Sequence, residues 1–255
     1  MFDFGKVFKL VAPVAAMALA GGLAGCNGEV RINGEEGKRL SELDLSGAAP
    51  TALSLLGPDR VLVSEGDGLA ITVEGEAADH VRFVLDEGSL AILRESGNRS
   101  GTGTATINVT MPAPSQLVLA GSGSITSAAL AKEAEIVIAG SGMIETPSID
   151  VDELDINIAG SGNYRATGSV DSLDLNIAGS GDVRMNDVMV GRAEINIAGS
   201  GNAEFRSDGE VEAKFMGSGN VAVTGKATCT MNGIGSGSLR CRSGANTTGS
   251  NVDAE

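Results

Sequence analysis

The triplet Gly-Ser-Gly occurs seven times in the second half of this chain, at nearly constant spacing. Successive copies are 19, 20, 19, 20, 18 and 18 residues apart. They begin at Gly121, Gly140, Gly160, Gly179, Gly199, Gly217 and Gly235. A repeat this short predicts backbone windings stacked one on the next, because a propeller blade or a helical repeat needs a longer period. Each winding has room for two or three short strands joined by tight corners.

Apolar residues recur at fixed positions around each triplet. Four residues before the first glycine stand Leu117, Ile136, Ile156, Leu175, Ile195, Ala213 and Met231. Two before it stand Leu119, Ile138, Ile158, Ile177, Ile197, Phe215 and Gly233. Two after the last glycine stand Ile125, Ile144, Tyr164, Val183, Ala203, Val221 and Leu239. Strict alternation predicts an inward strand face, and stacking would build aliphatic columns with about 4.8 Å between windings.

The triplet itself is predicted to be a corner. Glycine adopts positive φ and allows close backbone approach, so two glycines around a small residue turn the chain sharply. The following residue is Asn or Asp in four copies, which fits the corner because both tolerate left-handed backbone. The middle serines would stack there and hydrogen-bond along their column: Ser122, Ser141, Ser161, Ser180, Ser200, Ser218 and Ser236.

Residues 116–239, with Ile-Asn-Ile-Ala-Gly-Ser-Gly at Ile156 and Ile195, resemble the bacterial head GIN domain family, labelled "putative auto-transporter adhesin". The preceding segment from Ala52 to Pro114, with its short apolar runs, also resembles that family. The resemblance implies an all-β, single-stranded, right-handed β-helix-like solenoid and carries over no catalytic residue. We therefore expect a solenoid domain over residues 52–243, comprising a strand-rich leader (52–115) and the repeats (116–243), then a disordered tail (244–255).

The first 25 residues have the pattern of a secretory signal. Lys6 and Lys9 precede an apolar run from Leu10 to Leu23, which is too short and too interrupted by glycine to span a bilayer. The run ends in Leu-Ala-Gly-Cys26, which resembles the lipobox of bacterial lipoproteins. That resemblance implies acylation of Cys26 and anchoring to a membrane, with Asn27 favouring the outer membrane. Residues 26–51 would form the lipidated cysteine and a flexible polar tether.

Charge and composition limit the classes of partner and site that this chain can have. The net charge of −15 argues against nucleic acid as a partner, because a phosphate-binding protein needs a basic face. The chain has no Trp and one Tyr, which disfavours a sugar site built on stacked aromatic rings. His80 is the single histidine and lies in a predicted strand, away from any nucleophile elbow. We predict no catalytic residue, no metal ligand and no cofactor site.

Two outward columns are polar. One lies five residues before the triplet, and it comprises Glu135, Asp155, Asp174, Glu194 and Glu212. It would bind Ca²⁺ or a basic partner, or form a solvated face that discourages aggregation, and we favour the solvated face. The other column lies three residues before the triplet and holds Asn157, Asn176, Asn196 and Asn232. Its amides would hydrogen-bond up the stack or bind a ligand, and we favour the ladder.

Cys229 and Cys241 flank the last triplet. Alternation points both side chains inward, and an oxidising compartment favours a disulfide between them over two buried thiols. Their spacing is not that of a Cys-x-x-Cys redox pair.

Three functions are compatible with these patterns. The first is a non-enzymatic envelope lipoprotein that displays its solenoid for adhesion to a protein or glycan partner. The second is a polysaccharide-active β-helix enzyme, which short coils and scarce aromatics disfavour. The third is a structural spacer without a ligand.

The lipobox yields a direct prediction. Replacing Cys26 with Ser should abolish incorporation of labelled fatty acid and release the protein from the membrane fraction, because several acyl chains are needed for stable anchoring. Metabolic acyl labelling, combined with protease treatment of intact cells, measures lipidation and orientation together. Equal labelling of wild type and Cys26→Ser would contradict the assignment.

Overall fold

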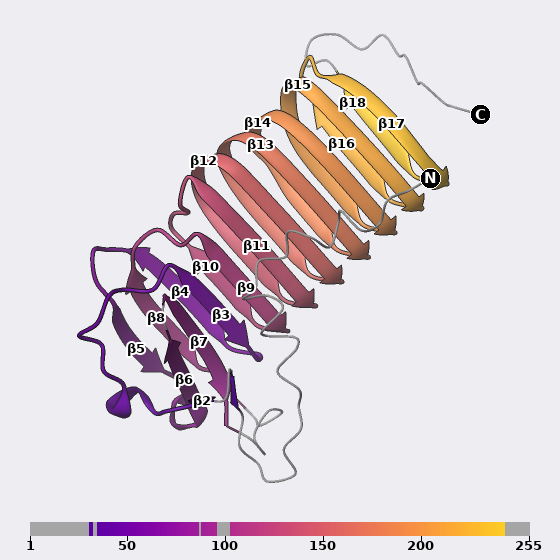
Figure 1. Cartoon of the computed structure of the whole chain (residues 1–255). Coiled ribbons are helices and arrows are strands. Elements are labelled where there is room, and N and C mark those ends of the chain that lie inside the picture. The colour runs from indigo at the N-terminus through magenta and orange to yellow at the C-terminus, as the bar shows by residue number, and fades with distance from the viewer. Residues whose placement is uncertain (1–30, 33–34, 87, 96–102, 243–255) are drawn as a thin grey trace.

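A computed structural model describes residues 31–32, 35–86, 88–95 and 103–242. This part of the chain is built of β-strands and two single-turn 3-10 helices, η1 (Leu40–Glu42) and η2 (Ala78–His80). The strands stack into a β-solenoid of about seven turns, which confirms the expected fold class. Figure 1 shows the strands side by side along a rod, from the indigo end to the yellow end. The predicted signal segment, Cys26 and the 244–255 tail lie outside the described residues.

The repeats form parallel, in-register windings in which each triplet lies on the one before. The strands are β9 (Gln116–Gly121), β10 (Ser124–Ser127), β11 (Glu133–Gly140), β12 (Met143–Gly160), β13 (Asn163–Gly179), β14 (Asp182–Gly199), β15 (Asn202–Gly217), β16 (Asn220–Thr224), β17 (Thr228–Gly235) and β18 (Ser238–Arg242). Strands β12 to β15 each run through most of a winding and bend at register shifts, such as that between Thr146 and Ile149. One long bent strand per winding thus replaces the two or three short ones expected.

The aliphatic columns form the core. Members four and two residues before the triplet are at most 5% exposed from β9 to β15, and the column after the triplet is buried as far as Val221. The columns fail only in the last winding, where Met231 is 38% exposed and Gly233 offers no side chain. Along the described chain no strand follows β17 and β18 in the stack, so nothing covers Met231. Each buried aliphatic side chain elsewhere contributes about 1.5–3 kcal/mol.

Both glycines of a triplet lie too close to the winding below for a side chain. Gly160 has φ +119°, and a Cβ there would lie 2.5 Å from the carbonyl oxygen of Gly140 in the winding below. A Cβ at Gly142, the third residue of its triplet, would lie 2.5 Å from the carbonyl oxygen of Gly123 and 2.6 Å from Leu119 Cδ2 of the core column. The backbone N–H of Ser161 donates to the Gly140 carbonyl at 2.8 Å. The corner is therefore joined along the stack by main-chain bonds, where we had expected serine hydroxyls.

The leader segment stacks out of chain order. Its strands are β3 (Ala52–Leu56), β4 (Arg60–Glu65), β5 (Ala70–Glu74), β6 (Val81–Asp86), β7 (Ser89–Arg94) and β8 (Thr106–Met111). Strands β3 and β4 lie directly beneath β9 and β10, and β7 and β8 lie beneath β3 and β4. Strands β5 and β6 pair antiparallel with β8 and β7 and end the stack. The later part of the leader is thus farther from the repeats than its beginning.

A buried ion pair joins these reordered windings. Arg94, at the end of β7, donates from Nε to Asp59 Oδ2 at 2.6 Å and from Nη2 to Asp59 Oδ1 at 2.5 Å. Asp59 Oδ1 also accepts from the Ala105 N–H at 2.7 Å. Both side chains are nearly inaccessible, and the bonds to Asp59 raise the pKa of Arg94. One carboxylate therefore ties the β3–β4 corner to the segments that end β7 and precede β8.

Part of the predicted tether contacts the domain. Residues Arg31–Ile32 (β1) pair with Glu35–Glu36 (β2), and Lys38 forms an antiparallel bridge with Phe83 on the outer side of β6. Leu40, Leu43 and Leu45 are partly buried against the core. These leucines supply the apolar area that a free linker lacks, so the part of the tether from residue 37 onward packs on the solenoid.

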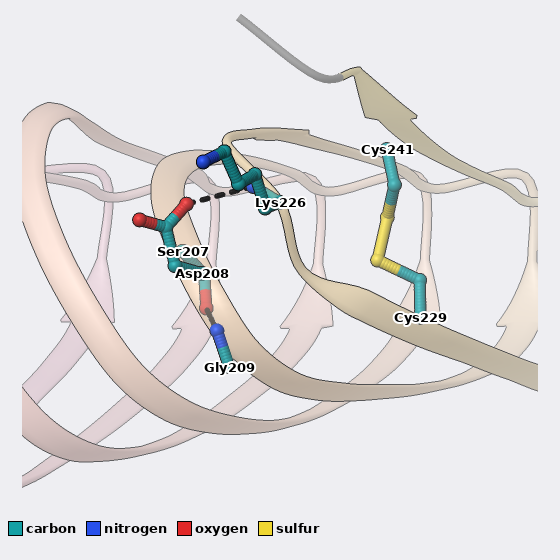
Figure 2. Close-up of a disulfide and its surroundings, with 6 residues drawn as sticks. All are labelled: Ser207, Asp208, Gly209, Lys226, Cys229 and Cys241. Carbon is teal, nitrogen blue, oxygen red and sulfur yellow. Dashed lines mark hydrogen bonds between the residues drawn. A yellow bond between two sulfur atoms is a disulfide. The ribbon is translucent and has the colours of Figure 1, made fainter.

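A disulfide closes the last winding. Cys229 on β17 and Cys241 on β18 are joined, with 6.7 Å between their Cα atoms (Figure 2). In register, Cys229 lies over Val211 and Cys241 over Val223, both 1% exposed. Beside it, Asp208 Oδ1 accepts from the Lys226 N–H at 2.7 Å, fixing the bend that precedes β17. The disulfide thus spans the end of the core, where a further winding would otherwise be needed to cover it.

The glycine column can be tested by adding one methyl group. Gly160→Ala should destabilise the solenoid by about 1–3 kcal/mol, because alanine is strained at this φ and its Cβ meets a carbonyl. Gly68→Ala is the matched control, since a Cβ there meets nothing within 4 Å. Chemical denaturation measures both variants. Equal stability of the two would contradict the close-packed corner.

Candidate functional site

The outward side of the segment before each triplet is a flat polar surface, which we call the acidic–amide face. It consists of four columns in register, at seven, five, three and one residues before the triplet. In the winding of β12 these positions are Glu153, Asp155, Asn157 and Ala159. The intervening residues Leu154, Ile156 and Ile158 point into the core and are at most 2% exposed. The buried columns therefore hold the outward columns in place.

The five carboxylates expected in one column are brought together. Registered pairing places Glu135 beside Asp155, then Asp174, Glu194 and Glu212. Both ends of this column are compensated. Gln116 Nε2 donates to Glu135 Oε2 at 2.6 Å, and Lys214 Nζ lies 2.8 Å from Glu194 Oε1 and 3.3 Å from Glu212 Oε1.

Negative charge therefore concentrates at the centre of the column, on Asp155 and Asp174. Both side chains are half-buried, and desolvation raises the pKa of Asp155 to about 6, with further contributions from the charges of Asp174, Glu153 and Glu135. Desolvation also raises the pKa of Asp174, while its hydrogen bond with Asn176 opposes the change. A proton or a hydrogen-bond donor from a partner would relieve this repulsion.

The asparagine column forms the expected ladder. Asn196 Nδ2 donates to Asn176 Oδ1 at 3.1 Å, and Asn176 Nδ2 donates to Asn157 Oδ1 at 3.3 Å. Asn176 Nδ2 also donates to Asp174 Oδ1 at 2.9 Å, which links the amide column to the acidic one. Asn232, in the uncovered last winding, is exposed and takes no part in these bonds. The ladder orients alternating amide donors and acceptors along the rod.

A second polar ladder was not anticipated. It lies directly after the triplet, where we had interpreted Asn and Asp only as corner residues. Asn202 Nδ2 donates to Asp182 Oδ1 at 2.8 Å, Asn220 Nδ2 to Asn202 Oδ1 at 3.1 Å, and Ser238 Oγ to Asn220 Oδ1 at 2.8 Å. These residues begin strands β14, β15, β16 and β18. Polar residues at one fixed repeat position were the sequence signal for this ladder.

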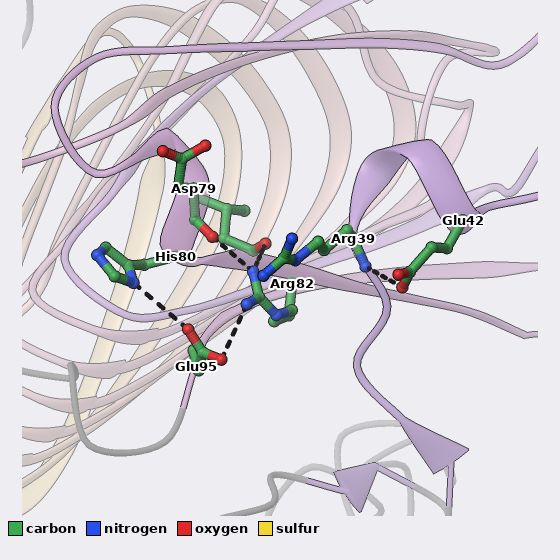
Figure 3. A network of polar contacts seen from close by, with 7 residues as sticks. Arg39, Glu42, Asp79, His80, Arg82 and Glu95 are labelled. Carbon is green, nitrogen blue, oxygen red and sulfur yellow. Dashed lines mark hydrogen bonds and ion pairs between the residues drawn. The ribbon is translucent and has the colours of Figure 1, made fainter.

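His80 lies away from both ladders. It ends η2 instead of lying in a strand, because the 3-10 turn from Ala78 precedes β6. Its Nδ1 lies 3.4 Å from Glu95 Oε2, and Arg82 Nη2 lies 2.9 Å from Glu95 Oε1 (Figure 3). The hydrogen bond with His80, with the charge of Arg82, lowers the pKa of Glu95. The cluster joins the start of β6 to the end of β7, and this contact is structural.

Metal ligation finds no support in the described residues. In that part of the chain, no group of three or more His, Cys, Asp or Glu side chains is arranged to hold a metal ion. The acidic column runs in a line along the rod, with neighbouring members on successive windings, so its carboxylates do not converge on one point.

Residues 49–227 match the model of the family described as "Putative auto-transporter adhesin, head GIN domain". The chain belongs to this family. The match spans the leader strands and the repeats as far as the bend before β17, and the resemblance identified from the triplets is confirmed. Among curated proteins the search found no match.

Solved structures of proteins described as putative adhesins or as a putative lipid binding protein share the fold. A putative adhesin from Bacteroides fragilis superposes with a TM-score of 0.65 at 14% identity, covering 76% of this chain and 92% of that one. A putative lipid binding protein from Parabacteroides distasonis superposes with a TM-score of 0.61 at 22% identity, covering 76% of this chain and 93% of that one. A putative adhesin from Parabacteroides merdae superposes with a TM-score of 0.55 at 15% identity, covering 76% of this chain and 92% of that one. At these identities the likeness shows the fold alone.

The charge at the centre of the acidic column predicts a pH dependence. The folded state binds a proton at Asp155 more readily than the unfolded state, so this residue makes stability fall as pH rises from 3.8 to about 6. Asp155→Asn should therefore raise the free energy of unfolding by about 1–2 kcal/mol above that window, after allowing for solvent screening. The gain should vanish below the window, where wild-type Asp155 is protonated in both states.

Thermal or chemical unfolding at two pH values, above and below the window, measures this effect. The control is Asp171→Asn, which removes the same charge from an exposed position on the same rod. If Asp155→Asn raised the free energy of unfolding equally at both pH values, or by the same amount as the control, repulsion in the acidic column would not be the cause of the increase.

Proposed function

We propose that this protein is a non-enzymatic adhesin-like protein of the cell envelope, which binds an extended partner through its acidic–amide face. The observation that carries this proposal is the in-register repetition of that face. Five successive windings, on β11 to β15, present a carboxylate in the acidic column, and three of them, on β12 to β14, also present an asparagine, with about 4.8 Å between neighbouring members. A partner with its own regular spacing, such as a glycan chain or an extended protein segment, meets many equivalent weak contacts at once.

The chemistry of the face defines what such a partner should offer. Asp155 and Asp174 are hydrogen-bond acceptors without a salt bridge among the described residues, although the charge of Lys214 acts on Asp174. The amides of Asn157 and Asn176 provide both donors and acceptors. Hydroxyl or basic groups of a partner complement this set. The column one residue before the triplet consists here of exposed alanines, Ala159, Ala178 and Ala198. Because their side chains are short, an extended partner chain can lie close to the strand backbone.

Attachment to the membrane through acylated Cys26 completes the proposal. In the described part of the chain no helix is long and apolar enough to cross a bilayer. The lipobox-like sequence supports the anchor, and the residues that follow it would set the distance between the outer membrane and the solenoid.

The polysaccharide-active enzyme is the less favoured alternative. The acidic column would supply its carboxylates, but they lie in a line of neighbours on successive windings and four of the five have amide or lysine partners. A glycosidase needs two carboxyl groups on opposite sides of one scissile bond. A structural spacer without a ligand is compatible with the fold, and the test below separates it from an adhesin.

The proposal predicts a loss of attachment when the face is altered. A strain lacking the gene should attach less to its substratum, wild-type protein should restore attachment, and Asp155→Lys/Asp174→Lys should fail to restore it. The control Asp171→Lys/Asp187→Lys makes the same change in charge at two exposed positions outside the face. Equal attachment with and without the gene would contradict an adhesin, and full rescue by the face variant would locate adhesion elsewhere. Surface amounts of each variant are measured in parallel.

A further inference from the structure

One continuous run of paired strands reaches from one end of the rod to the other. It is formed by the segments that follow the triplets, and its strand order is β18, β16, β15, β14, β13, β12, β10, β4, β8 and β5. Strand β18 pairs only with β16, and β5 pairs only with β8, so within the described residues each has one edge without a strand partner. Edges of this kind are templates for a further strand.

The two open edges carry opposite charge. Residues 225–242, which contain β17 and β18, hold Lys226, Arg240 and Arg242 and no acidic residue. Residues 64–79, which contain β5 and its flanking loops, hold five acidic residues and no basic one: Glu65, Asp67, Glu74, Glu76 and Asp79. All five are exposed, as are Arg240 and Arg242. In a chain of net charge −15, the C-terminal winding is thus a local basic end.

Strand direction is compatible with joining these ends. Strand β5 is antiparallel to β8, and β8 runs parallel to the stack that ends in β18. A second copy translated along the rod would therefore place its β5 antiparallel to β18 and continue the sheet. The neighbouring edge of β6 is already occupied by Lys38, whose N–H and carbonyl each bond with Phe83 at 2.8 Å. The pairing is thereby restricted to β5.

Apolar side chains are also exposed at this end of the rod, on β15 and β17. Met231, in the inward column of β17, is 38% exposed because no described winding covers it. Met216 and Ile234 are 51% and 71% exposed in the outward column one residue before the triplet. A second copy stacked on this end would cover Met231 and add to the strand pairing. The disulfide between Cys229 and Cys241 keeps this last winding closed, so the edge is presented as a formed strand.

We propose that copies of this protein associate head to tail, with the acidic β5 edge of one copy docking on the basic β18 edge of the next. The contact is heterologous, because the two surfaces differ, so it generates an open chain of rods and no closed dimer. Attraction between the ends is electrostatic and weakens in high salt.

Sedimentation velocity of the purified full-length protein tests this proposal. At low salt the weight-average mass should rise steadily with protein concentration to several times that of one chain, and it should fall toward one chain in high salt. A mass that stays at one chain, or that stops at a dimer, would overturn the proposal.

Charge reversal at each end sharpens the test. Arg240→Glu/Arg242→Glu and Glu74→Lys/Glu76→Lys should each remove the concentration dependence. A chain carrying all four changes should regain it, since the ends are complementary again and the net charge equals that of wild type. The control Asp171→Lys/Glu204→Lys makes the same change in charge as the β5 variant on the flank of the rod and should assemble like wild type. Failure of the fourfold variant to assemble, with an unchanged thermal melt, would refute the pairing.

Discussion

The in-register stacking of identical corners is the constraint on which the rest of this structure depends. Each winding lies on the previous one through main-chain bonds such as that from Ser161 N–H to the Gly140 carbonyl, and this approach leaves no room for a Cβ at the glycine positions. Once the corners are aligned, alternation directs every aliphatic column inward and every polar column outward. The core, the asparagine ladder and the acidic column are therefore consequences of a single register.

That register also creates repulsion between neighbouring carboxylates, which nearby amide and lysine side chains partly offset. Carboxylates of successive windings are forced beside one another, and amide or lysine partners compensate the column at both ends. At the centre, Asp155 keeps its charge in a half-buried position among other carboxylates, and its pKa is raised for that reason. Repulsion retained at a half-buried, repeated position is consistent with a surface shaped by binding, because Asn at these positions would remove the repulsion.

The two ends of the solenoid are terminated by different structures. At the N-terminal end, antiparallel strands β5 and β6 terminate the stack, and residues around Lys38 cover the edge of β6. At the C-terminal end, a disulfide spans the core, and the last strands have one edge without a strand partner among the described residues. Charge separates the two ends as well. A rod with one acidic and one basic end has a direction, and this direction is what permits assembly without a closing symmetry.

The triplet spacing and the alternation around it determined the all-β class, the stacked windings, the identity of the core columns, and the acidic and asparagine columns of the acidic–amide face. These features depend on local periodicity, which a linear sequence displays directly. Only the tertiary structure decided the order of the leader windings, in which β7 and β8 insert beneath β3 and β4. It also decided the docking of Leu40 and Leu43 and the joining of Asp59 to Arg94. These contacts link segments that share no repeat, so their partners are selected by burial and charge across the fold, and no spacing in the sequence records them.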